Sequence, residues 1–343
     1  MRGGGRGRPV VVTAVSALPP PGPQRASIPP PGPHGGDGAR VAAALGIPPD
    51  SVLDLSASLN PVAPPIAPIL SKYLDVMVRY PDPAQATLAL AAAIGVDASR
   101  LVLTNGGAEA IALVASELGA GWVDEPDFSL YRRHLAVLDP MAPRFASNPH
   151  NPTGRLVPAD SRPTAAPVTS STPWGCAGVW DEAFFPMATG TWTRGDAERG
   201  CYVAGSLTKL FACPGLRAGY LLAPNEAAAE RIRSRQPHWA VNGLVCAALP
   251  EMLDGLDLAA TASAIARLRV ELDSLLRGHG FDSQPSDANY LLVPDAAGLR
   301  DVLASRGVVV RDCTSFGLPD VIRVAVPDEA GLDRLDRALR VVE

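Results

Sequence analysis

The twelve residues 206–217, SLTKLFACPGLR, bring a lysine, two hydroxyl groups and an arginine close together in the chain. Lysine is scarce here, because only Lys72 and Lys209 stand among thirty basic residues. A guanidinium stays protonated and cannot form an imine, whereas a lysine amine can lose its proton and condense with an aldehyde. We therefore interpret Lys209 as a residue that does chemistry and Lys72 as an ordinary surface lysine. The hydroxyls and the arginine could hold a phosphate carried by the same aldehyde.

The composition is that of a globular protein long enough for two domains. Its 343 residues are 47% hydrophobic and 19% charged, which is typical of a soluble chain with a substantial core. A formal charge of −5 argues against bulk nucleic-acid binding, since no basic surplus exists to replace counterions. No apolar run approaches the roughly 20 residues that span a bilayer. The five cysteines show no metal-like spacing, so we expect no metal site and reduced thiols in a cytoplasmic enzyme.

Residues 1–33 differ in composition from the rest of the chain. A basic start at residues 2–8 precedes a weak apolar stretch at residues 10–18 and two proline-rich clusters. This order loosely resembles a secretion signal. Proline-rich sequence without periodicity is more typical of a flexible extension, and we expect one here.

From Leu101 onward, short apolar runs alternate with helical patterns. Strands are predicted at residues 101–104, 121–124, 177–181, 202–205 and 219–222, and helices at residues 108–118 and 129–138. Strands that alternate with helices predict an α/β fold with a mostly parallel sheet flanked by helices. Ligands then bind at the carboxyl ends of the strands. We assign residues 61–235 to this large domain.

The pattern changes near Gln236-Pro237. Helices are predicted at residues 240–256, 258–279 and 330–341, and strands at residues 289–293, 308–311 and 322–326. This order predicts a smaller α+β domain over residues 236–343.

Further motifs lie at predicted strand ends. Residues 105–109, NGGAE, end a strand and open a helix, so their amides could bind an anion, although glycine is common in such turns for structural reasons alone. Residues 148–154, NPHNPTG, form a rigid turn that projects the amide of Asn151, and this seven-residue pattern is the more specific signal. Asp181 ends an apolar strand, where a carboxylate is costly unless it is paired, although it could instead cap a helix.

Two arginines of the small domain are candidate anion ligands. Arg311 and Arg323 flank a loop and could each bind a substrate anion through two parallel hydrogen bonds. Surface salt bridges are the alternative interpretation of both residues.

Together these motifs resemble the fold-type-I pyridoxal-phosphate enzymes, the aspartate-aminotransferase superfamily, from His34 to the C-terminus. The resemblance implies that Lys209 joins the cofactor aldehyde and that Asp181 keeps the pyridine nitrogen protonated, so that the ring can accept electrons. It also implies that Asn151 donates to the ring's phenolate oxygen and that Phe128 stacks on the ring. The remaining residues implied to bind the cofactor, most of them around its phosphate, are Gly106, Gly107, Ala108, Ser206, Thr208 and Arg217.

The resemblance also has a consequence for assembly. Tyr80, in RYPDP at residues 79–83, is similar to a tyrosine that reaches the phosphate of the neighbouring subunit. A homodimer with two shared sites is therefore implied.

The implied chemistry sets a requirement for Lys209. Its amine must be deprotonated when it attacks or re-forms the imine, although a free lysine titrates near 10.4. We therefore expect burial and the nearby Arg217 to lower the pKa of Lys209.

Within the superfamily the chain resembles most the L-threonine-O-3-phosphate decarboxylases of cobalamin biosynthesis. The histidinol-phosphate aminotransferases are a close second. The stretches that favour the decarboxylases are residues 34–37, 53–61, 236–242, 286–292 and 310–313. Phe184 agrees with them, because the aminotransferases usually carry tyrosine there. The resemblance implies loss of carbon dioxide from threonine phosphate to give (R)-1-aminopropan-2-yl phosphate, with transfer of an amino group, as on histidinol phosphate, as the alternative.

A small phosphorylated amino acid needs ligands for two anionic groups. We expect Arg323 to bind the carboxylate, and Arg311, His34 and Asn60 to bind the phosphate, with Asn151 also close to the substrate. Residues 34–60 then form an N-terminal substrate segment associated with the small domain. His34 alone is weak support, since a histidine in a glycine-rich loop is often merely solvated.

Three features depart from the pattern of the decarboxylases. Asp37 stands where asparagine is usual, and Thr104 stands where glycine is usual. Only nineteen residues, 129–147, separate Phe128 from Asn148. We therefore expect a shortened or missing crossover element and an abbreviated sheet.

A different class of function is a catalytically idle fold of this type that senses a ligand and regulates transcription. Such regulators usually carry a DNA-binding module. The extension at residues 1–33 is too short and too rich in proline to form a helix-turn-helix, so we expect neither nucleic acid nor membrane among the partners.

Overall fold

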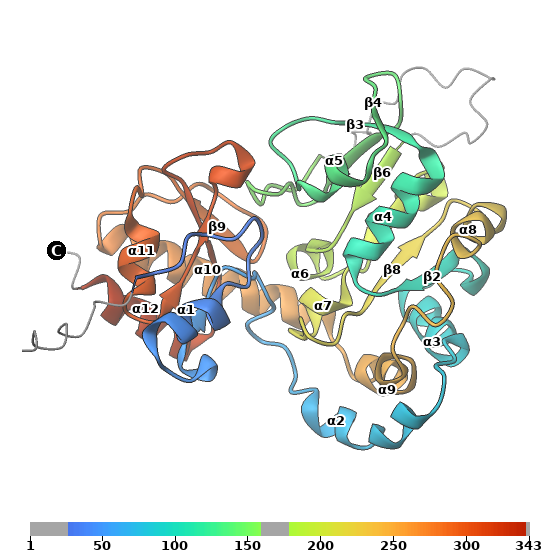
Figure 1. The fold of residues 1–343 in the computed structure, drawn as a ribbon, viewed down its shortest axis with the longest axis horizontal. Coiled ribbons are helices and arrows are strands. Elements are labelled where there is room, and N and C mark those ends of the chain that lie inside the picture. Colours follow the sequence, from blue (N-terminus) through green and yellow to red (C-terminus); the bar gives the residue numbers. More distant parts are fainter. Residues whose placement is uncertain (1–26, 159–177, 341–343) are drawn as a thin grey trace, which may run out of the picture.

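The computed structural model describes residues 27–158 and 178–340, which form two parts with separate cores (Figure 1). Most of the expected N-terminal extension lies outside the described residues. Its last residues are held by the small part: Ile28 packs near Val309, and Arg300 Nη1 donates to the carbonyl of Pro29 at 2.7 Å. The expected flexibility therefore does not extend to residues 28 and 29.

A seven-stranded sheet forms the centre of the larger part. Its strands are β2 (Leu101–Thr104), β3 (Ala120–Val123), β4 (Val137–Leu138), β5 (Arg144–Ser147), β6 (Gly178–Asp181), β7 (Tyr202–Gly205) and β8 (Gly219–Leu222), in the order β2-β8-β7-β6-β5-β3-β4. All neighbours are parallel except β8, which is antiparallel to β2 and β7. The predicted α/β fold is confirmed.

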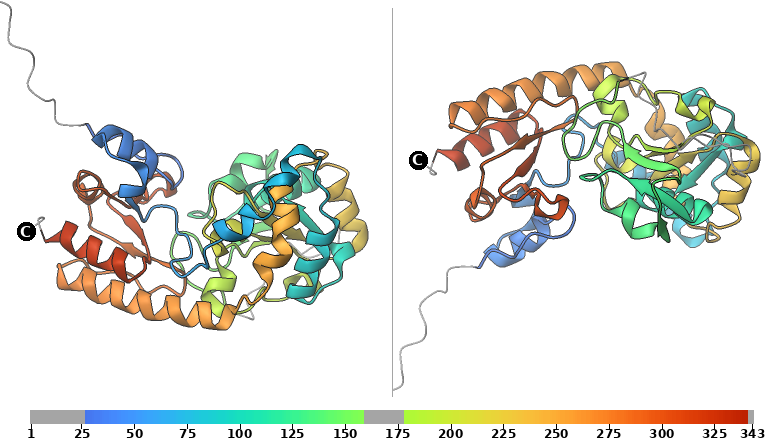
Figure 2. Two further views of the ribbon diagram at one scale, coloured as in Figure 1. Left: turned by 90° about the horizontal axis from the view of Figure 1, so that it is seen from below. Right: turned by 90° about the horizontal axis from the view of Figure 1, so that it is seen from above.

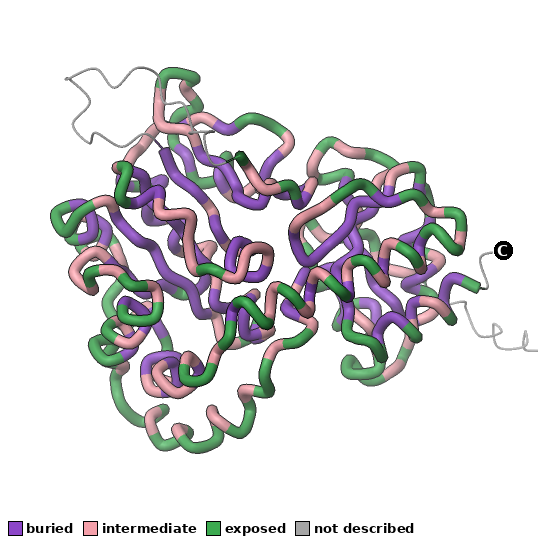
Figure 3. The backbone as a smooth tube through the Cα atoms, turned by 180° about the vertical axis from the view of Figure 1, so that it is seen from behind, coloured by how far each residue is buried: buried purple, intermediate pink, exposed green. Residues whose placement is uncertain are grey.

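Helices cover both faces of this sheet. One core contains side chains of α4 (Gly107–Leu118), α5 (Leu130–His134) and α8 (Glu226–Arg233), and the other contains those of α3 (Ala84–Ile94), α6 (Phe185–Thr189), α7 (Leu207–Leu210) and α9 (Gly243–Leu253). Val102 of β2 belongs to the first core and Leu101 and Leu103 to the second, because successive strand side chains point to opposite faces. The strands other than the exposed edge strand β4 are accordingly largely buried between partly exposed helices (Figure 3).

We expected a shortened or missing crossover element and an abbreviated sheet around residues 129–147, but these residues supply two strands, β4 and β5, of the seven-stranded sheet. Residues 129–147 fold into α5, β4 and β5, and only residues 139–143 connect β4 to β5. The helix predicted over residues 129–138 ends at His134 because Val137 and Leu138 pair with Ala120 and Gly121 of β3.

The smaller part contains two short sheets. β9 (Tyr290–Val293), β12 (Ile322–Ala325) and β11 (Arg311–Asp312) are antiparallel in the order β11-β12-β9, and β1 (Leu53–Asp54) is parallel to β10 (Val308–Val309). The helices of this part are α1 (Gly38–Leu45), α11 (Leu299–Ala304) and α12 (Glu329–Leu339). The strand predicted at residues 308–311 is thus divided between the two sheets. The N-terminal segment of residues 34–60 contributes β1, which agrees with its expected association with this part.

The helix α10 (Leu258–Gly278) joins the two parts (Figure 2). Ile265 belongs to the core of the larger part, whereas Leu268 and Leu272 belong to the core of the smaller one. The helix α9, which the sequence assigned to the small domain, packs on α3 of the larger part. We therefore propose that the domain boundary lies within α10 instead of at residue 236.

The remaining elements lie on the surface of these two parts. They are α2 (Ala67–Ser71) and the 3₁₀ helices η1 (Pro49–Ser51), η2 (Leu74–Val78), η3 (Ala98–Arg100), η4 (Asp196–Arg199) and η5 (Thr314–Phe316). Of the helices in residues 27–158 and 178–340, none combines the length and hydrophobicity that a membrane crossing requires.

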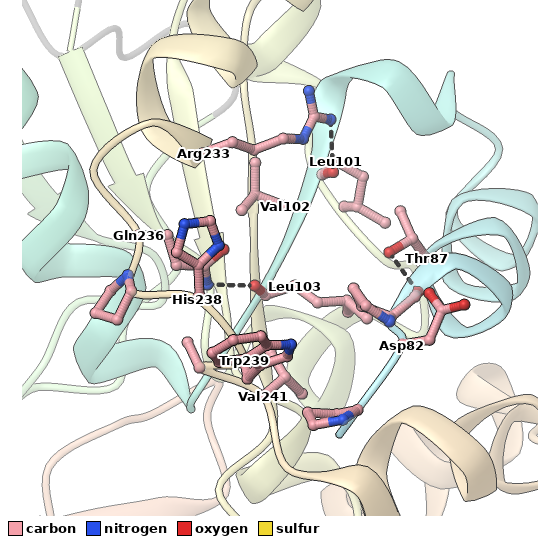
Figure 4. Close-up of a pocket in the computed structure, with 14 residues that line it drawn as sticks. Asp82, Thr87, Leu101, Val102, Leu103, Arg233, Gln236, His238, Trp239 and Val241 are labelled. Atoms are coloured by element: carbon pink, nitrogen blue, oxygen red, sulfur yellow. Dashed lines mark hydrogen bonds between the residues drawn. The ribbon is translucent and has the colours of Figure 1, made fainter. Parts of the chain in front are cut away.

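The edge strand β2 has its outer carbonyls capped by side chains (Figure 4). Arg233 Nη2 donates to the carbonyl of Leu101 at 3.2 Å, and Gln236 Nε2 donates to that of Leu103 at 2.8 Å. The caps occupy acceptors that another strand could otherwise use. Both side chains border a cavity of about 390 Å³ outside β2, and Trp239 lines it as well.

Candidate active site

The predicted site residues that follow the strands of the large sheet meet at one end of it. β2, β6 and β7 run in the same direction, so their carboxyl ends lie at the same edge. Gly106 follows β2, Asp181 ends β6, and Ser206 follows β7. The fold therefore brings together motifs that lie up to one hundred residues apart, as expected for a ligand site of an open α/β sheet.

Lys209 is held at the centre of this edge by its main chain and by its amine. Its Nζ donates to the carbonyl of Ala57 at 2.6 Å and lies 5.9 Å from the ring centre of Phe184. Burial, and after it the charges of Arg323 and Arg217, lower the pKa of Lys209 to about 8 against the opposing charge of Asp181. The expectation for this amine is confirmed, although burial outweighs the arginines and Arg323 acts more strongly than Arg217.

Asp181 presents a carboxylate at the floor of the site. Its Oδ2 accepts from the Tyr131 hydroxyl at 2.9 Å, and its Oδ1 accepts from the amide of Ala183 at 2.9 Å. Burial raises the pKa of Asp181, while the hydrogen bonds and the charge of Lys209 oppose that shift. A cation beside this carboxylate would restore its charge, which suits the protonated nitrogen of a pyridine ring.

The turn after β2 and the loop after α7 form an anion cradle. A Cβ on Gly106 would lie 2.5 Å from Arg217 Nη2, so the guanidinium lies directly over this glycine. Gly106 has φ +78°, which favours glycine in its own right. Gly107 and Ala108 open α4, and Gly107 faces Ser206. Free amides at a helix start beside an arginine and a serine are a suitable site for a phosphate.

The structure explains why threonine can stand at position 104, where glycine is usual. It is fully buried, and its hydroxyl donates to the carbonyl of Gly106 at 3.1 Å. Asp37 also has one, since its carboxylate accepts from the amide of Gly32 at 2.9 Å and from Arg40 at 3.0 Å. Both replacements stabilise the loops in which they lie.

The turn at residues 148–154 presents Asn151 to the smaller part. Arg323 Nη1 donates to Asn151 Oδ1 at 2.5 Å, and its guanidinium lies 4.5 Å from the ring centre of Tyr290. Arg323 Nε has no partner among the described residues. A buried guanidinium with an unused donor beside the reactive lysine is suited to bind a carboxylate.

The aromatic side of the site joins the two parts of the protein. The ring of His34 makes an edge contact with Phe128 at 5.9 Å between centres. Arg311 donates to the carbonyls of Gly32 and Pro33 at 2.7 and 2.6 Å and so positions the loop that carries His34. Burial lowers the pKa of His34, and the charges of Arg311 and Arg133 lower it further.

Three predicted site residues are engaged in the fold itself. The Thr208 hydroxyl exchanges hydrogen bonds of 3.1 Å with the main chain of Ala218. Asn60 Nδ2 donates to the carbonyl of Leu210 at 2.8 Å, and its Oδ1 accepts from the amide of Val62 at 3.0 Å. The terminal nitrogens of Arg311 donate to the loop before His34 and to the Ser315 hydroxyl. We expect these residues to hold the shape of the site more than to contact its ligands.

Tyr80, which was predicted to reach the phosphate of a neighbouring subunit, stacks on Trp239 at 4.4 Å between ring centres. Trp239 lines the cavity outside β2 (Figure 4), and Pro81, which follows Tyr80 in the chain, lines it as well. Lys209 is not among the residues that line this cavity.

The sequence interpretation missed four contributors to the site. Tyr131 and Asp127 lie beneath it, Arg133 is a cationic neighbour of His34, and the carbonyl of Ala57 receives the lysine amine. Tyr131 and Arg133 lie in the helix that was predicted at residues 129–138. Their closeness to Phe128 in the sequence could therefore have indicated a place in the site. A main-chain carbonyl such as that of Ala57 leaves no comparable signal in the sequence.

The residues present fit pyridoxal phosphate. Such a group requires an amine, a carboxylate for the ring nitrogen and a cradle for the phosphate. Lys209, Asp181 and the Gly106–Arg217 pair provide these three, and a side chain at Gly106 would fill the cradle.

Comparison with known proteins supports this interpretation. The model of the family "Aminotransferase class I and II" matches residues 145–339. The chain is 33% identical to a threonine-phosphate decarboxylase of Salmonella typhimurium, over 90% of this chain and 96% of that protein. It is 27% identical to a histidinol-phosphate aminotransferase of Dechloromonas aromatica, over 87% of this chain and 93% of that protein.

The fold also agrees with a solved structure. The histidinol-phosphate aminotransferase of Sinorhizobium meliloti in complex with pyridoxal-5'-phosphate superimposes with a TM-score of 0.73 at 19% identity, covering 89% of this chain and 95% of that one. The extent of the sequence matches establishes the family. This chain belongs to the class I and II aminotransferases.

Proposed function

We propose that this protein decarboxylates L-threonine O-3-phosphate to (R)-1-aminopropan-2-yl phosphate for cobalamin biosynthesis. It is an enzyme, and its cofactor is pyridoxal 5'-phosphate. The observation that carries the choice of reaction is the 33% identity to the Salmonella decarboxylase over nearly the whole chain. Phe184 agrees with it, because the ring beside Lys209 lacks the hydroxyl that the aminotransferases usually carry.

Arg323 is the proposed ligand of the substrate carboxylate. It is buried, held by Asn151 and Tyr290, and has an unused Nε among the described residues. A fixed guanidinium orients a carboxylate as well as binding it, because its donors lie in one plane. The orientation matters since the bond held perpendicular to the cofactor ring is the one that breaks.

The substrate phosphate is proposed to lie near His34 and Arg133, and Arg311 acts on it through its charge while its terminal nitrogens hold the loop before His34. Arg311 comes from the smaller part and Arg133 from α5 of the larger part, and both act electrostatically on His34. Arg133 is exposed and has no ion-pair partner among the described residues. A dianion here would offset the repulsion among the three groups and would favour a protonated His34.

Lys209 is the proposed proton donor. When bound, the cofactor supplies an electron sink for the charge that develops at the substrate Cα. The Cα–carboxylate bond breaks, carbon dioxide leaves, and Lys209 returns one proton to Cα. An amine whose pKa is about 8 can both carry and release a proton near neutral pH.

Product analysis tests the proposal. The purified protein with pyridoxal phosphate should convert O-phosphothreonine to 1-aminopropan-2-yl phosphate and carbon dioxide without a keto-acid acceptor. Mass spectrometry of reactions with and without 2-oxoglutarate would distinguish the possible products. A strict requirement for 2-oxoglutarate would overturn the decarboxylase assignment.

Amino-group transfer from histidinol phosphate or a related amino acid is the second candidate. The match to the Dechloromonas aminotransferase, at 27% identity over 87% of this chain, favours it. The same assay with histidinol phosphate decides between the two, because only transfer consumes the acceptor.

A homodimer is proposed from the exposed apolar residues near Tyr80. Val78 is 89% exposed, Tyr80 is 77% exposed and Trp239 is 60% exposed, and Met77 and Leu74 lie beside them on η2. A large exposed apolar patch is typical of an interface. A second copy of the chain would cover this patch and receive Tyr80 at its phosphate cradle.

A further inference from the structure

A second buried carboxylate lies beneath the site and has no role in the function described so far. Asp127 is 3% exposed. Its Oδ1 accepts from the amide of Phe128 at 2.7 Å and from the hydroxyl of Ser147 at 2.6 Å, and its Oδ2 accepts from the amide of Ser147 at 3.0 Å. A buried carboxylate is expensive unless such donors surround it, so its presence calls for a physical reason.

The partners of Asp127 lead directly to the residues that face the cofactor. Phe128, the proposed stacking ring, is its neighbour in the chain and donates to it. Ser147 accepts from the amide of Asn151 at 2.7 Å through the same hydroxyl that donates to Asp127. One carboxylate thus fixes both the aromatic loop and the turn at residues 148–154.

Tyr131 extends this group to the ring-nitrogen carboxylate. Its hydroxyl donates to Asp181, and its ring makes an edge contact with Phe128 at 5.7 Å between centres. Asp127 and Ser147 both act on the phenol of Tyr131. Three elements, the loop before α5, the end of β5 and the end of β6, are therefore joined under the site.

We propose that Asp127 is a positioning residue that, through Ser147 and Tyr131, holds Phe128, Asn151 and Asp181 in one fixed arrangement around the pyridine ring. The proposal rests on the proposed function, because it concerns the same cofactor. The ionised Asp127 would be a second negative charge beneath the ring, behind Asp181. A rigid support of this kind keeps the groups that contact the ligand in productive geometry.

The charges around Asp127 determine the sign of its effect. Burial, with a smaller contribution from the charge of Asp181, raises the pKa of Asp127 to about 7 against the opposing hydrogen bonds from Ser147 and Phe128. The other titratable groups that face this region are Tyr131 on α5, Asp181 on β6, Lys209 on α7, Tyr290 on β9, Arg323 on β12 and His150 in the turn. A cationic ring above Asp181 favours the ionised form of Asp127.

The test compares Asp127→Asn with Asp196→Asn. Asp196 is also buried, at 1% exposure, but it lies before β7, at the end of that strand away from the site, and pairs with Arg194 at 2.6 Å. Both substitutions should lower the melting temperature. Asp127→Asn alone should weaken pyridoxal phosphate binding about tenfold, since lost charged hydrogen bonds are worth that much. It should also reduce the induced circular dichroism of the bound cofactor and move the pH titration of its absorbance to lower pH.

A cofactor-free measurement separates this proposal from the function on which it rests. Because the pKa of Asp127 is raised on folding, its contribution to stability is present below the ordinary aspartate range near 3.9 and is lost as pH rises through about 7. That loss should be absent from Asp127→Asn and reduced in Tyr131→Phe. Tyr220→Phe, which removes a buried hydroxyl without a partner among the described residues, should retain it.

The outcomes are distinct. If Asp127→Asn and Asp196→Asn give the same cofactor affinity, dichroism and titration, the positioning role is overturned. If the wild type binds no cofactor, the proposed function fails, and the cofactor-free titration still decides whether Asp127, Tyr131 and Asp181 act as one unit.

Discussion

The amine of Lys209 donates a hydrogen bond to the carbonyl oxygen of Ala57 across the junction of the two parts of the protein, at 2.6 Å. The same two segments are joined again, since the amide of Asn60 donates to the carbonyl of Lys209 at 3.1 Å. Lys209 is therefore positioned by the N-terminal segment before any aldehyde arrives. This hydrogen bond fixes the position of the Lys209 amine, which therefore depends on the conformation of residues 57–60.

Replacing Lys209 with alanine should give a folded protein that cannot attach the cofactor. The only other lysine in the sequence is Lys72, and it pairs with the half-buried Glu251. We expect no visible absorbance band after incubation with pyridoxal phosphate and no label after borohydride reduction. Lys72→Ala is the matched control and should retain both. A reducible chromophore in Lys209→Ala would refute the assignment.

Replacing Arg323 with glutamine should move the pH dependence of cofactor attachment upward. Arg323 is the largest of the charges that lower the pKa of Lys209. Without it the amine stays protonated to a higher pH, so the rate of attachment, which requires the neutral amine, should rise later along the pH axis. Stopped-flow absorbance across pH 6 to 10 measures this rate. Arg311→Gln is the control, since Arg311 is not among the charges that act on Lys209, and an equal shift in both variants would contradict the explanation.

The elements that the sequence predicted well are those whose patterns are local. β2, β7 and β8 have uninterrupted apolar runs with glycine or proline nearby, and they begin and end as expected. Lys209 and Asp181 follow such runs, so their convergence at one sheet edge could be inferred from the direction of the strands.

The remainder depended on contacts between distant segments. β5 was not predicted because its four residues, Arg144–Ser147, contain two polar side chains that tertiary partners satisfy. β4 was hidden within a helical pattern because its two residues become a strand only by pairing with β3. The engagement of Asn60 with Leu210 spans 150 positions, and no local pattern reports it.

Replacing Gly106 with alanine should impair the phosphate cradle. The added Cβ would lie 2.5 Å from Arg217 Nη2 at a residue with φ +78°, so the guanidinium must move. We expect at least about a tenfold loss of cofactor affinity, comparable to the loss of one charged hydrogen bond. Gly95→Ala is the matched control, because Gly95 has φ +80° and nothing within 4 Å of the added Cβ. It should cost about 1 kcal/mol of stability and leave affinity unchanged. Equal affinities for the two variants would mean that the phosphate lies elsewhere.

Complementation between two inactive variants tests the dimer and the part that Tyr80 takes in it. A chain with Tyr80→Ala keeps its lysine but should fail to complete the partner's cradle, and a chain with Lys209→Ala keeps Tyr80 but cannot react. If Tyr80 acts across the interface, a mixed dimer has one site with both groups intact, and roughly half of the wild-type activity should return because a twofold dimer has two equivalent sites.

The control mixes Lys209→Ala with Arg323→Gln. Those two residues serve the same site of one chain, where Arg323 acts on the amine of Lys209. That mixture should stay as inactive as its parents, since neither site of the mixed dimer carries both groups. Purifying mixed dimers through two different tags and assaying them measures both cases. Recovery in neither mixture would place Tyr80 in its own chain's site, whereas recovery in the first mixture alone requires that Tyr80, stacked on Trp239 at 4.4 Å, crosses to the neighbouring subunit.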